Sequence, residues 1–264
     1  MIGIVGVGVV GSAIKLFFQS KNLPVATYDK FKGEGSLEDC LKADIIFLCL
    51  PTLFDGEHFN KEEIYSVCQI LDSFNYQGIV VLKSTVEPGT TSNLEQQFKL
   101  RIVHNPEFLS ADTALKDFVE QTHIVVGGKP ELTREVQSFY REYFPLADIS
   151  LSTSVESESM KIFANSFYAV KIQFFNELYL ACRENGADFN TVKQMMIKNG
   201  WINPMHTQVP GKDGQLSYGG MCFPKDTYAL LTYLKELNLP SAVLQATVIE
   251  RDQMRFNPST PATP

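Results

Sequence analysis

A glycine-rich segment near the N-terminus constrains the fold of this chain more than any other feature. The sequence GVGVVG at positions 6–11 directly follows the apolar run 2–5 and opens a segment with helical periodicity. In that context Gly6 permits a tight turn, Gly8 lets the backbone approach a pyrophosphate, and Gly11 allows a helix to pack closely on a strand. The motif therefore predicts a strand–turn–helix unit that presents helix N–H groups to phosphates.

The next apolar run ends in an acidic residue at the position that a dinucleotide requires. Residues Val25–Tyr28 lead into Asp29, 18 residues after Gly11. A carboxylate there accepts hydrogen bonds from adenine-ribose hydroxyls and repels a 2′-phosphate, so NAD is favoured over NADP. The alternatives are a glycine turn that binds nothing and an acid in a surface turn. We expect the cofactor to contact Gly6, Gly8, Val9, Val10, Gly11 and Asp29.

Apolar runs alternate with amphipathic segments over the first half of the chain. The runs are rich in Val and Ile, as strands buried on both faces are, and they cover 2–5, 25–28, 45–50, 79–82, 102–104 and 124–126. Helical patterns fit 12–19, 61–74 and 131–143. This alternation predicts an α/β fold over residues 1–150: a Rossmann-like, doubly wound parallel sheet with right-handed crossovers.

The second half of the chain is mostly helical. From Val155 to Asn185 no Pro or Gly interrupts the pattern, Ser154 fits an N-cap and Gly186 fits the C-terminal stop. Further helices fit 189–199 and 226–237, another begins near Ser241, and the stretch 200–220 predicts a structured loop. We expect a helical central domain at 151–256 and a disordered tail at 257–264.

Composition and charge narrow the classes of function. The chain has 264 residues, of which 44% are hydrophobic and 20% charged, as is typical of a globular protein with a packed core. Its net charge of −7 disfavours a nucleic-acid binder. Five widely spaced cysteines without a C-x-x-C pair predict neither a disulfide framework nor a metal site, and favour the cytoplasm. No apolar run reaches the roughly 18 residues of a membrane span.

One of the cysteines lies where a nucleophile is expected. Cys222 stands in the loop SYGGMCFPKD at 217–226, behind two glycines and just before a predicted helix. The helix dipole and the adjacent lysine stabilise a thiolate there, whereas Cys49 and Cys182 fall inside predicted elements and fit small core residues. Spacing alone leaves a structural role for Cys222 equally open. Asp226 either caps the helix or positions water as a base.

Lys161 and Asn165 lie four residues apart on the predicted long helix and therefore share one face. A fixed cation beside an amide donor stabilises a developing alkoxide or oxyanion. The alternative is a solvated helix face with no chemical role. The presence of a dinucleotide motif and a candidate nucleophilic cysteine in the same chain favours a chemical role for the pair.

Together these motifs resemble the UDP-glucose/GDP-mannose dehydrogenase family. The matches run in the family's order over nearly the whole chain: GVGVVG at 6–11, LPT at 50–52, KSTV at 83–86, NPEFL at 105–109, E-x-x-K-x-x-x-N at 158–165, FNE at 175–177 and GGMCFPKD at 219–226. The resemblance implies a four-electron oxidation, in which a nucleotide-sugar C6 alcohol becomes a carboxylate while two NAD+ are reduced. UDP-glucose is the substrate favoured by the resemblance.

The resemblance also implies roles for individual residues. Cys222 attacks the intermediate aldehyde to form a thiohemiacetal and then a thioester, and Lys161 stabilises the oxyanion states. Asn165 holds the reacting oxygen, Asp226 positions or activates water, and Glu107 takes part in thioester hydrolysis. An acyl-forming second oxidation needs a nucleophile, whereas a single alcohol oxidation does not.

Further positions follow from the same resemblance. Pro51 and Thr52 line the cofactor pocket, and Thr85 lies near both sugar and cofactor. The substrate is expected to contact Glu107, Phe108, Leu109, Lys161, Asn165, His206, Lys212, Tyr218 and Gly219. His206 and Lys212 are expected because many members carry an arginine upstream of the cysteine loop, which this chain lacks. A plain loop role is the alternative for both.

Two other departures from the family pattern bear on function. Ala111 stands where many members have a second glutamate, so any proton transfer by that acid is missing or reassigned. The chain stops shortly after residue 255, where members usually continue into a nucleotide-binding C-terminal domain, and we expect that domain to be absent. The sequence does not identify the sugar or the nucleobase.

Three hypotheses remain open at this point. The first is an active nucleotide-sugar dehydrogenase, either with a reduced substrate pocket or completed by another chain. The resemblance also implies a dimer contact through the helix 155–185, where Phe167, Phe174 and Tyr179 fit either core or interface positions. The second is a two-electron hydroxyacid dehydrogenase, which needs no cysteine loop. The third is a non-catalytic NAD-binding partner of a complete enzyme.

Overall fold

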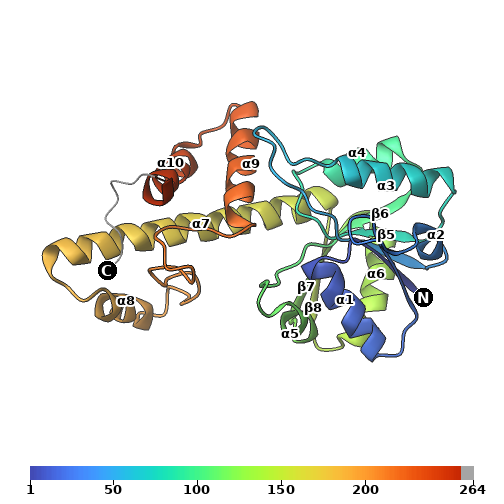
Figure 1. Ribbon diagram of the computed structural model, residues 1–264, viewed down its shortest axis with the longest axis horizontal. Helices are drawn as coiled ribbons and strands as arrows, with labels where there is room; N and C mark the ends of the chain where they lie inside the picture. The colour runs from blue at the N-terminus through green and yellow to red at the C-terminus, as the bar shows by residue number, and fades with distance from the viewer. Residues whose placement is uncertain (257–264) are drawn as a thin grey trace. The chain divides into compact units, whose positions relative to one another are not determined.

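The computed structural model of the chain describes residues 1–256 (Figure 1). It divides into two compact units, one of residues 1–55 and 59–161, the other of residues 56–58 and those from Ile162 onward. The sequence placed this division near residue 150, whereas the structure places it inside the long helix α7 (Ser154–Asn185). The expected disorder of 257–264 lies outside the described residues.

The first unit contains an eight-stranded sheet with the order β3-β2-β1-β4-β5-β6-β7-β8. Its strands are β1 (Ile2–Val5), β2 (Val25–Asp29), β3 (Glu34–Gly35), β4 (Ile45–Leu48), β5 (Ile79–Leu82), β6 (Arg101–His104), β7 (His123–Gly127) and β8 (Asp148–Ser152). The doubly wound fold is therefore confirmed. The sheet is mostly parallel rather than wholly so, since β2 pairs with β3, and β6 with β7, in antiparallel fashion.

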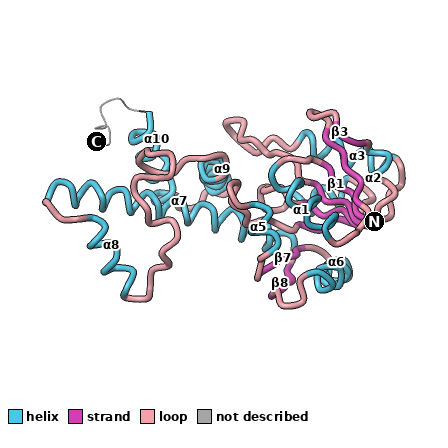
Figure 2. The backbone as a smooth tube through the Cα atoms, turned by 60° about the horizontal axis from the view of Figure 1, so that its bottom comes forward, coloured by secondary structure: helices cyan, strands magenta, loops and turns pink. Residues whose placement is uncertain are grey.

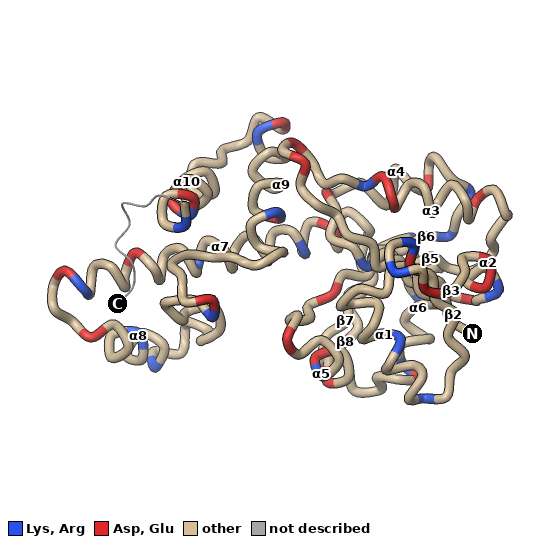
Figure 3. Tube along the Cα trace, in the orientation of Figure 1, with Lys and Arg blue, Asp and Glu red and all other residues tan. Residues whose placement is uncertain are grey.

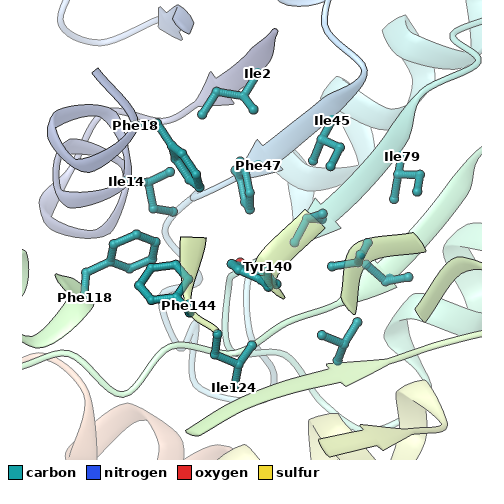
Figure 4. Close-up of a cluster of buried hydrophobic side chains, with 14 of the residues drawn as sticks. Ile2, Ile14, Phe18, Ile45, Phe47, Ile79, Phe118, Ile124, Tyr140 and Phe144 are labelled. Atoms are coloured by element: carbon teal, nitrogen blue, oxygen red, sulfur yellow. The ribbon is translucent and has the colours of Figure 1, made fainter. Parts of the chain in front are cut away.

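Helices cover both faces of this sheet. Successive residues of its central strands point to opposite sides, so each strand contributes to a buried cluster on either face. Ile2 and Phe47 belong to one buried cluster, shown in Figure 4, which α1 (Val9–Ser20), α5 (Ala114–Val119) and α6 (Pro130–Tyr143) help to form. The alternate residues Val5, Ile46 and Leu48 belong to a second cluster, to which α2 (Leu37–Cys40), α3 (Glu62–Ser73) and α4 (Thr90–Gln97) contribute. Burial on both faces explains the continuous apolar runs.

The second unit is built on most of α7, with α8 (Phe189–Lys198), α9 (Phe223–Glu236) and α10 (Ala242–Phe256). Its small core includes Phe175, Phe189 and Leu216. The segment between α8 and α9 is loop, as expected from its composition (Figure 2). Both acidic and basic residues occur along α10 (Figure 3).

Two expected helix boundaries need correction. Ser154 is the first residue of α7, and its neighbour Thr153 caps the helix instead. The Thr153 Oγ1 accepts the Glu156 N–H at 3.3 Å, while the Glu156 carboxylate accepts the Thr153 N–H at 2.7 Å, which is a capping box. Helix α9 begins three residues before Asp226, the start expected from the sequence. This earlier start makes Cys222 the N-cap residue of α9.

No described helix is both long enough and apolar enough to cross a bilayer.

Candidate active site

The glycine loop of the first unit has the geometry that a pyrophosphate requires. Gly6 has φ +88°, and a Cβ there would lie 2.5 Å from the carbonyl oxygen of Cys49. A Cβ on Gly11 would lie 2.0 Å from the Gly6 carbonyl oxygen, so the helix packs as closely as predicted. Gly8 is the N-cap of α1 without a side-chain cap, and the space around its missing Cβ is open. The loop therefore leaves room for a phosphate in front of the helix N-terminus.

Asp29 lies at the end of β2 and is bound to this loop. Its Oδ2 accepts the Val7 N–H at 2.8 Å, and its Oδ1 accepts the N–H groups of Phe31 and Lys32 at 3.1 and 2.9 Å. Burial acts to raise the pKa of Asp29, but the backbone donors outweigh it and lower the pKa below its usual value. The group is thus an ionised acid beside the glycine loop, as the NAD prediction requires.

Lys32 was not singled out from the sequence, yet it contacts the same loop. Its Nζ donates to the carbonyl oxygen of Val7 at 2.5 Å. A cation therefore lies at the glycine loop together with Asp29, and its charge helps to lower the pKa of that acid. Only the fold brings Lys32 to the glycine loop, 25 residues away in sequence.

The segments that follow β4 and β5 are joined to each other. The Thr52 hydroxyl donates to the Thr85 carbonyl oxygen at 2.7 Å, and the Ser84 hydroxyl donates to the Leu50 carbonyl oxygen at 2.6 Å. Thr52 is buried, whereas Pro51 is exposed. These expected residues thus meet at the carboxyl ends of parallel strands, where ligands of open α/β sheets bind.

The structure brings Lys161 and Glu107 together. The Lys161 Nζ donates to the Glu107 carbonyl oxygen at 2.5 Å and lies 3.6 Å from its Oε1. The same Nζ lies 5.1 Å from the ring centroid of Phe108, which is itself exposed. Lys161 is only 4% exposed, so the alternative of a solvated helix face is wrong for it. A buried cation beside a carboxylate can stabilise an anionic oxygen.

A buried network behind Glu107 was missed by the sequence analysis. Lys83, 5% exposed, donates from Nζ to the Asn105 Oδ1 at 2.8 Å, and the Tyr140 hydroxyl donates to the same oxygen at 2.5 Å. The Asn105 Nδ2 donates to the Val125 carbonyl oxygen at 2.6 Å. Burial lowers the pKa of Lys83 to about 8. The network fixes the segment before Glu107. Lys83 and Asn105 both belong to matched motifs, but the motifs did not show that the two side chains meet.

Glu158 is a second buried residue with a role that spacing did not reveal. Its Oε2 accepts the Gly89 N–H at 2.6 Å, and its Oε1 accepts the Thr91 N–H at 2.7 Å. Glu158 is 0% exposed and therefore caps the N-terminus of α4 from within the unit. The cap therefore fixes Gly89, where the segment that begins at Thr85 enters α4.

In the second unit, Asp226 lies between a cation and an amide. Its Oδ1 accepts Lys225 Nζ at 2.6 Å, and its Oδ2 accepts Asn165 Nδ2 at 2.6 Å. Asp226 is 0% and Asn165 6% exposed, so a solvated face is wrong for Asn165 too. Cys222 is exposed at the N-terminus of α9, and its carbonyl oxygen accepts the Asp226 N–H at 3.0 Å. The exposed cysteine is thus one helical turn before a buried carboxylate that has fixed partners.

Three of the remaining cysteines lie in helices, and Cys49, expected inside a strand, directly follows β4. Cys40, Cys68 and Cys182 are buried, and burial raises the pKa of the Cys49 thiol to about 12. A high thiol pKa leaves almost no thiolate at neutral pH. Among the five, Cys222 is the exposed one.

The loop residues expected at the substrate have different surroundings. The His206 ring centroid lies 4.6 Å from that of Tyr168 and 5.4 Å from that of Phe223, and burial lowers the pKa of His206. Lys212 is exposed. Tyr218 is 1% exposed, so this expected substrate residue presents almost no surface to solvent.

Leu109 packs partly against the apolar cluster of Figure 4, and its N–H donates to the Glu107 Oε2 at 2.6 Å. Ala111, the departure from the family pattern, is exposed. Among residues 1–256, no group of three His, Cys, Asp or Glu side chains is arranged to hold a metal ion.

Comparison with known proteins places these residues in a family. Residues 27–144 match the family model described as "UDP-glucose/GDP-mannose dehydrogenase family, NAD binding domain". Residues 155–251 match the model for the central domain of the same family. Together the two models cover most of the chain, including Glu107, Lys161, Asn165 and Cys222.

Curated relatives and solved structures agree with these models. A UDP-glucose 6-dehydrogenase of Campylobacter jejuni is 28% identical over 237 residues, covering 88% of this chain and 58% of the relative. One of Rhizobium meliloti is 31% identical, covering 81% and 51%. The chain thus spans about half the length of these relatives. A UDP-glucose dehydrogenase structure from Pyrobaculum islandicum has a TM-score of 0.82 at 23% identity, covering 95% of this chain and 67% of that one.

Proposed function

Since the chain belongs to the UDP-glucose/GDP-mannose dehydrogenase family, we propose that it catalyses the NAD-dependent oxidation of a nucleotide-sugar C6 alcohol to the carboxylate. UDP-glucose is the substrate we favour, with UDP-glucuronate as product. The observation that carries the proposal is the exposed Cys222 at the N-terminus of α9, next to a buried Asp226 held by Lys225 and Asn165. A two-electron alcohol dehydrogenase needs no such nucleophile.

The first unit would hold the cofactor. Gly6, Gly8 and the N-terminus of α1 would receive the pyrophosphate, and Asp29 the adenine ribose. Pro51, Thr52 and Thr85 would line the rest of the site. NAD+, when bound, supplies the hydride acceptor for both oxidation steps.

In the first oxidation the alcohol loses its proton and a hydride to give an aldehyde. Lys161, buried against Glu107, would stabilise the alkoxide that precedes hydride loss. Asn165 would hold the reacting oxygen through its amide. Both side chains are already fixed by contacts in the structure, which is what transition-state stabilisation requires.

In the second oxidation the Cys222 thiolate attacks the aldehyde carbon and forms a thiohemiacetal. Loss of a second hydride leaves a thioester on Sγ. Water, positioned by Asp226 and deprotonated by it or by Glu107, then adds to the thioester carbon. Collapse releases the carboxylate and regenerates the thiol, so four electrons leave the sugar in two pairs.

The proposal includes two statements about the whole protein. We propose a homodimer through α7, because Phe167 and Phe174 are 63% and 51% exposed on it, whereas Tyr179 packs on Phe189 at 5.5 Å.

We also propose a cytoplasmic location, supported by five cysteines that form no disulfide among themselves.

Counting NADH tests the proposed reaction. The purified chain is incubated with excess NAD+ and a limiting amount of one UDP- or GDP-sugar at a time. Two NADH per sugar, with a uronate as product, is the expected result for UDP-glucose. One NADH per molecule of a simple hydroxyacid would favour the two-electron alternative, and NAD binding without turnover of any nucleotide sugar would favour a non-catalytic partner.

A further inference from the structure

We infer that Arg255, in the last turn of α10, is a positioning residue that holds the loop of Cys222 in its active conformation. The inference rests on the proposed function of Cys222 and adds a residue about thirty positions downstream of the catalytic loop. Arg255 contacts the loop, not the thiol, so it acts through the residues that lead to Cys222. The hydrogen bonds that hold the loop converge on Ser217, five residues before the cysteine.

Ser217 is held by a separate hydrogen bond at each of its three polar atoms. Its N–H donates to the Asn176 Oδ1 at 2.8 Å, and its hydroxyl donates to the Gln173 Oε1. Its carbonyl oxygen accepts the Arg255 Nη2 at 3.0 Å. Ser217 is 2% exposed and has φ +61°, a left-handed conformation that is unfavourable for a non-glycine residue. A strained residue with so many partners is over-determined by its surroundings.

The guanidinium of Arg255 is itself locked in place. Its Nη1 donates to the Asp213 Oδ2 at 2.9 Å and to the Gln215 Oε1 at 3.2 Å. The side chain of Arg255 is only 9% exposed. One guanidinium therefore joins three loop residues to α10, using the planar arrangement of donors that distinguishes arginine from lysine.

Gly219 explains why this guanidinium fits against the loop. A Cβ on Gly219 would lie 2.5–2.7 Å from three atoms of the Arg255 guanidinium, so the charged group occupies the space of a side chain. Gly220 follows with φ +78°. Two consecutive glycines give this stretch high conformational freedom and no side chains to fix it. The path to Cys222 is therefore set by the anchor at Ser217, by the buried Tyr218, whose carbonyl oxygen accepts the Arg251 Nε at 3.4 Å, and by the start of α9.

The test compares Arg255→Gly with Arg183→Gly. Arg183 is an exposed residue in the last turn of α7, so the control carries the same backbone change at the same place in a helix. We expect Arg255→Gly to lower kcat with UDP-glucose by about tenfold or more, since hydrogen bonds from a charged group are lost. The KM for NAD+ stays within about twofold, because the first unit is untouched. Millimolar guanidinium ion is expected to restore most of the lost kcat.

A second readout does not depend on sugar oxidation. The rate at which iodoacetamide alkylates Cys222 is followed by peptide mass spectrometry in both variants. We expect slower alkylation in Arg255→Gly, because a displaced loop takes the thiol away from the helix N-terminus, and recovery with guanidinium. Alkylation and kcat equal to those of Arg183→Gly, or a loss that guanidinium leaves unchanged, would overturn the inference.

The two readouts separate this inference from the proposed function. Wild-type chain that binds NAD+ but oxidises no nucleotide sugar refutes the proposed function alone. The alkylation rates and their rescue by guanidinium would still decide whether Arg255 positions the cysteine loop.

Discussion

At the residue scale, the proposed nucleophile differs in its surroundings from the residues proposed to assist it. Cys222 is exposed, whereas Lys161, Asn165 and Asp226 are buried and already hydrogen-bonded. The motifs identified these four residues from their types and spacing. The supporting role of residues such as Lys83 was not predicted, because its motif does not show which residue the side chain will meet in the fold.

Lys83 supports a prediction about pH. Burial lowers its pKa to about 8, below the value of about 10.4 for an exposed lysine in the unfolded chain. Between these values the unfolded chain binds a proton that the folded chain has released, so the free energy of unfolding rises with pH. Lys83→Met removes this pH-dependent contribution to the free energy of unfolding. We therefore expect the stability of the wild type, relative to Lys83→Met, to increase from about pH 7.5 to about pH 10.

Urea denaturation at the two pH values measures this difference. Lys116→Met is the control, since the Lys116 side chain is 68% exposed. A wild-type advantage over Lys83→Met that is the same at both pH values would contradict the assignment of a buried, easily deprotonated lysine.

At the element scale, the sequence predicted the central strands and the long helices, and missed the short or edge elements. Strands β1, β4 and β5 are continuous apolar runs because they are buried on both faces. Strand β8 lies at the sheet edge with the mixed sequence DISLS, and β3 has only two residues, so neither carries a clear pattern. Helix α4 is polar, with the sequence TTSNLEQQ, and its cap comes from Glu158, 67 residues beyond Thr91.

Glu158→Gln tests that long-range cap. The amide accepts at one atom where the carboxylate accepted at two, so one of the α4 N-terminal donors loses its partner. We expect a loss of roughly 1–2 kcal/mol in the free energy of unfolding, and faster hydrogen exchange at the Gly89 and Thr91 amides. Glu156→Gln, which affects the capping box of α7, is the matched control. Exchange at Gly89 and Thr91 that rises equally in both variants would argue against a specific cap.

At the scale of the whole molecule, family membership and a two-unit organisation agree with the order of motifs along the chain. The division inside α7 could not be predicted, because a helix that serves two units has no break in its sequence pattern. The Arg255 anchor was equally hidden, since nothing near residue 255 suggests that it meets residues 213–219.

The proposed dimer is tested at this scale. Phe167→Glu and Phe174→Glu each place a charge on the exposed apolar positions of α7. We expect a shift from dimer to monomer in sedimentation velocity, because burying an unpaired charge in an interface is costly. Tyr233→Glu on α9 is not expected to change the oligomeric state. A wild-type chain that sediments as a monomer at every concentration would refute the dimer.

The thioester that we propose between Cys222 and the sugar in the second oxidation is tested by Cys222→Ser. The variant is incubated with limiting UDP-glucose and excess NAD+, and the wild type is acid-quenched in parallel for peptide mass spectrometry. We predict two NADH per sugar and a uronyl adduct on the Cys222 peptide in the wild type, and no uronate from Cys222→Ser. Full uronate formation by Cys222→Ser would contradict the account.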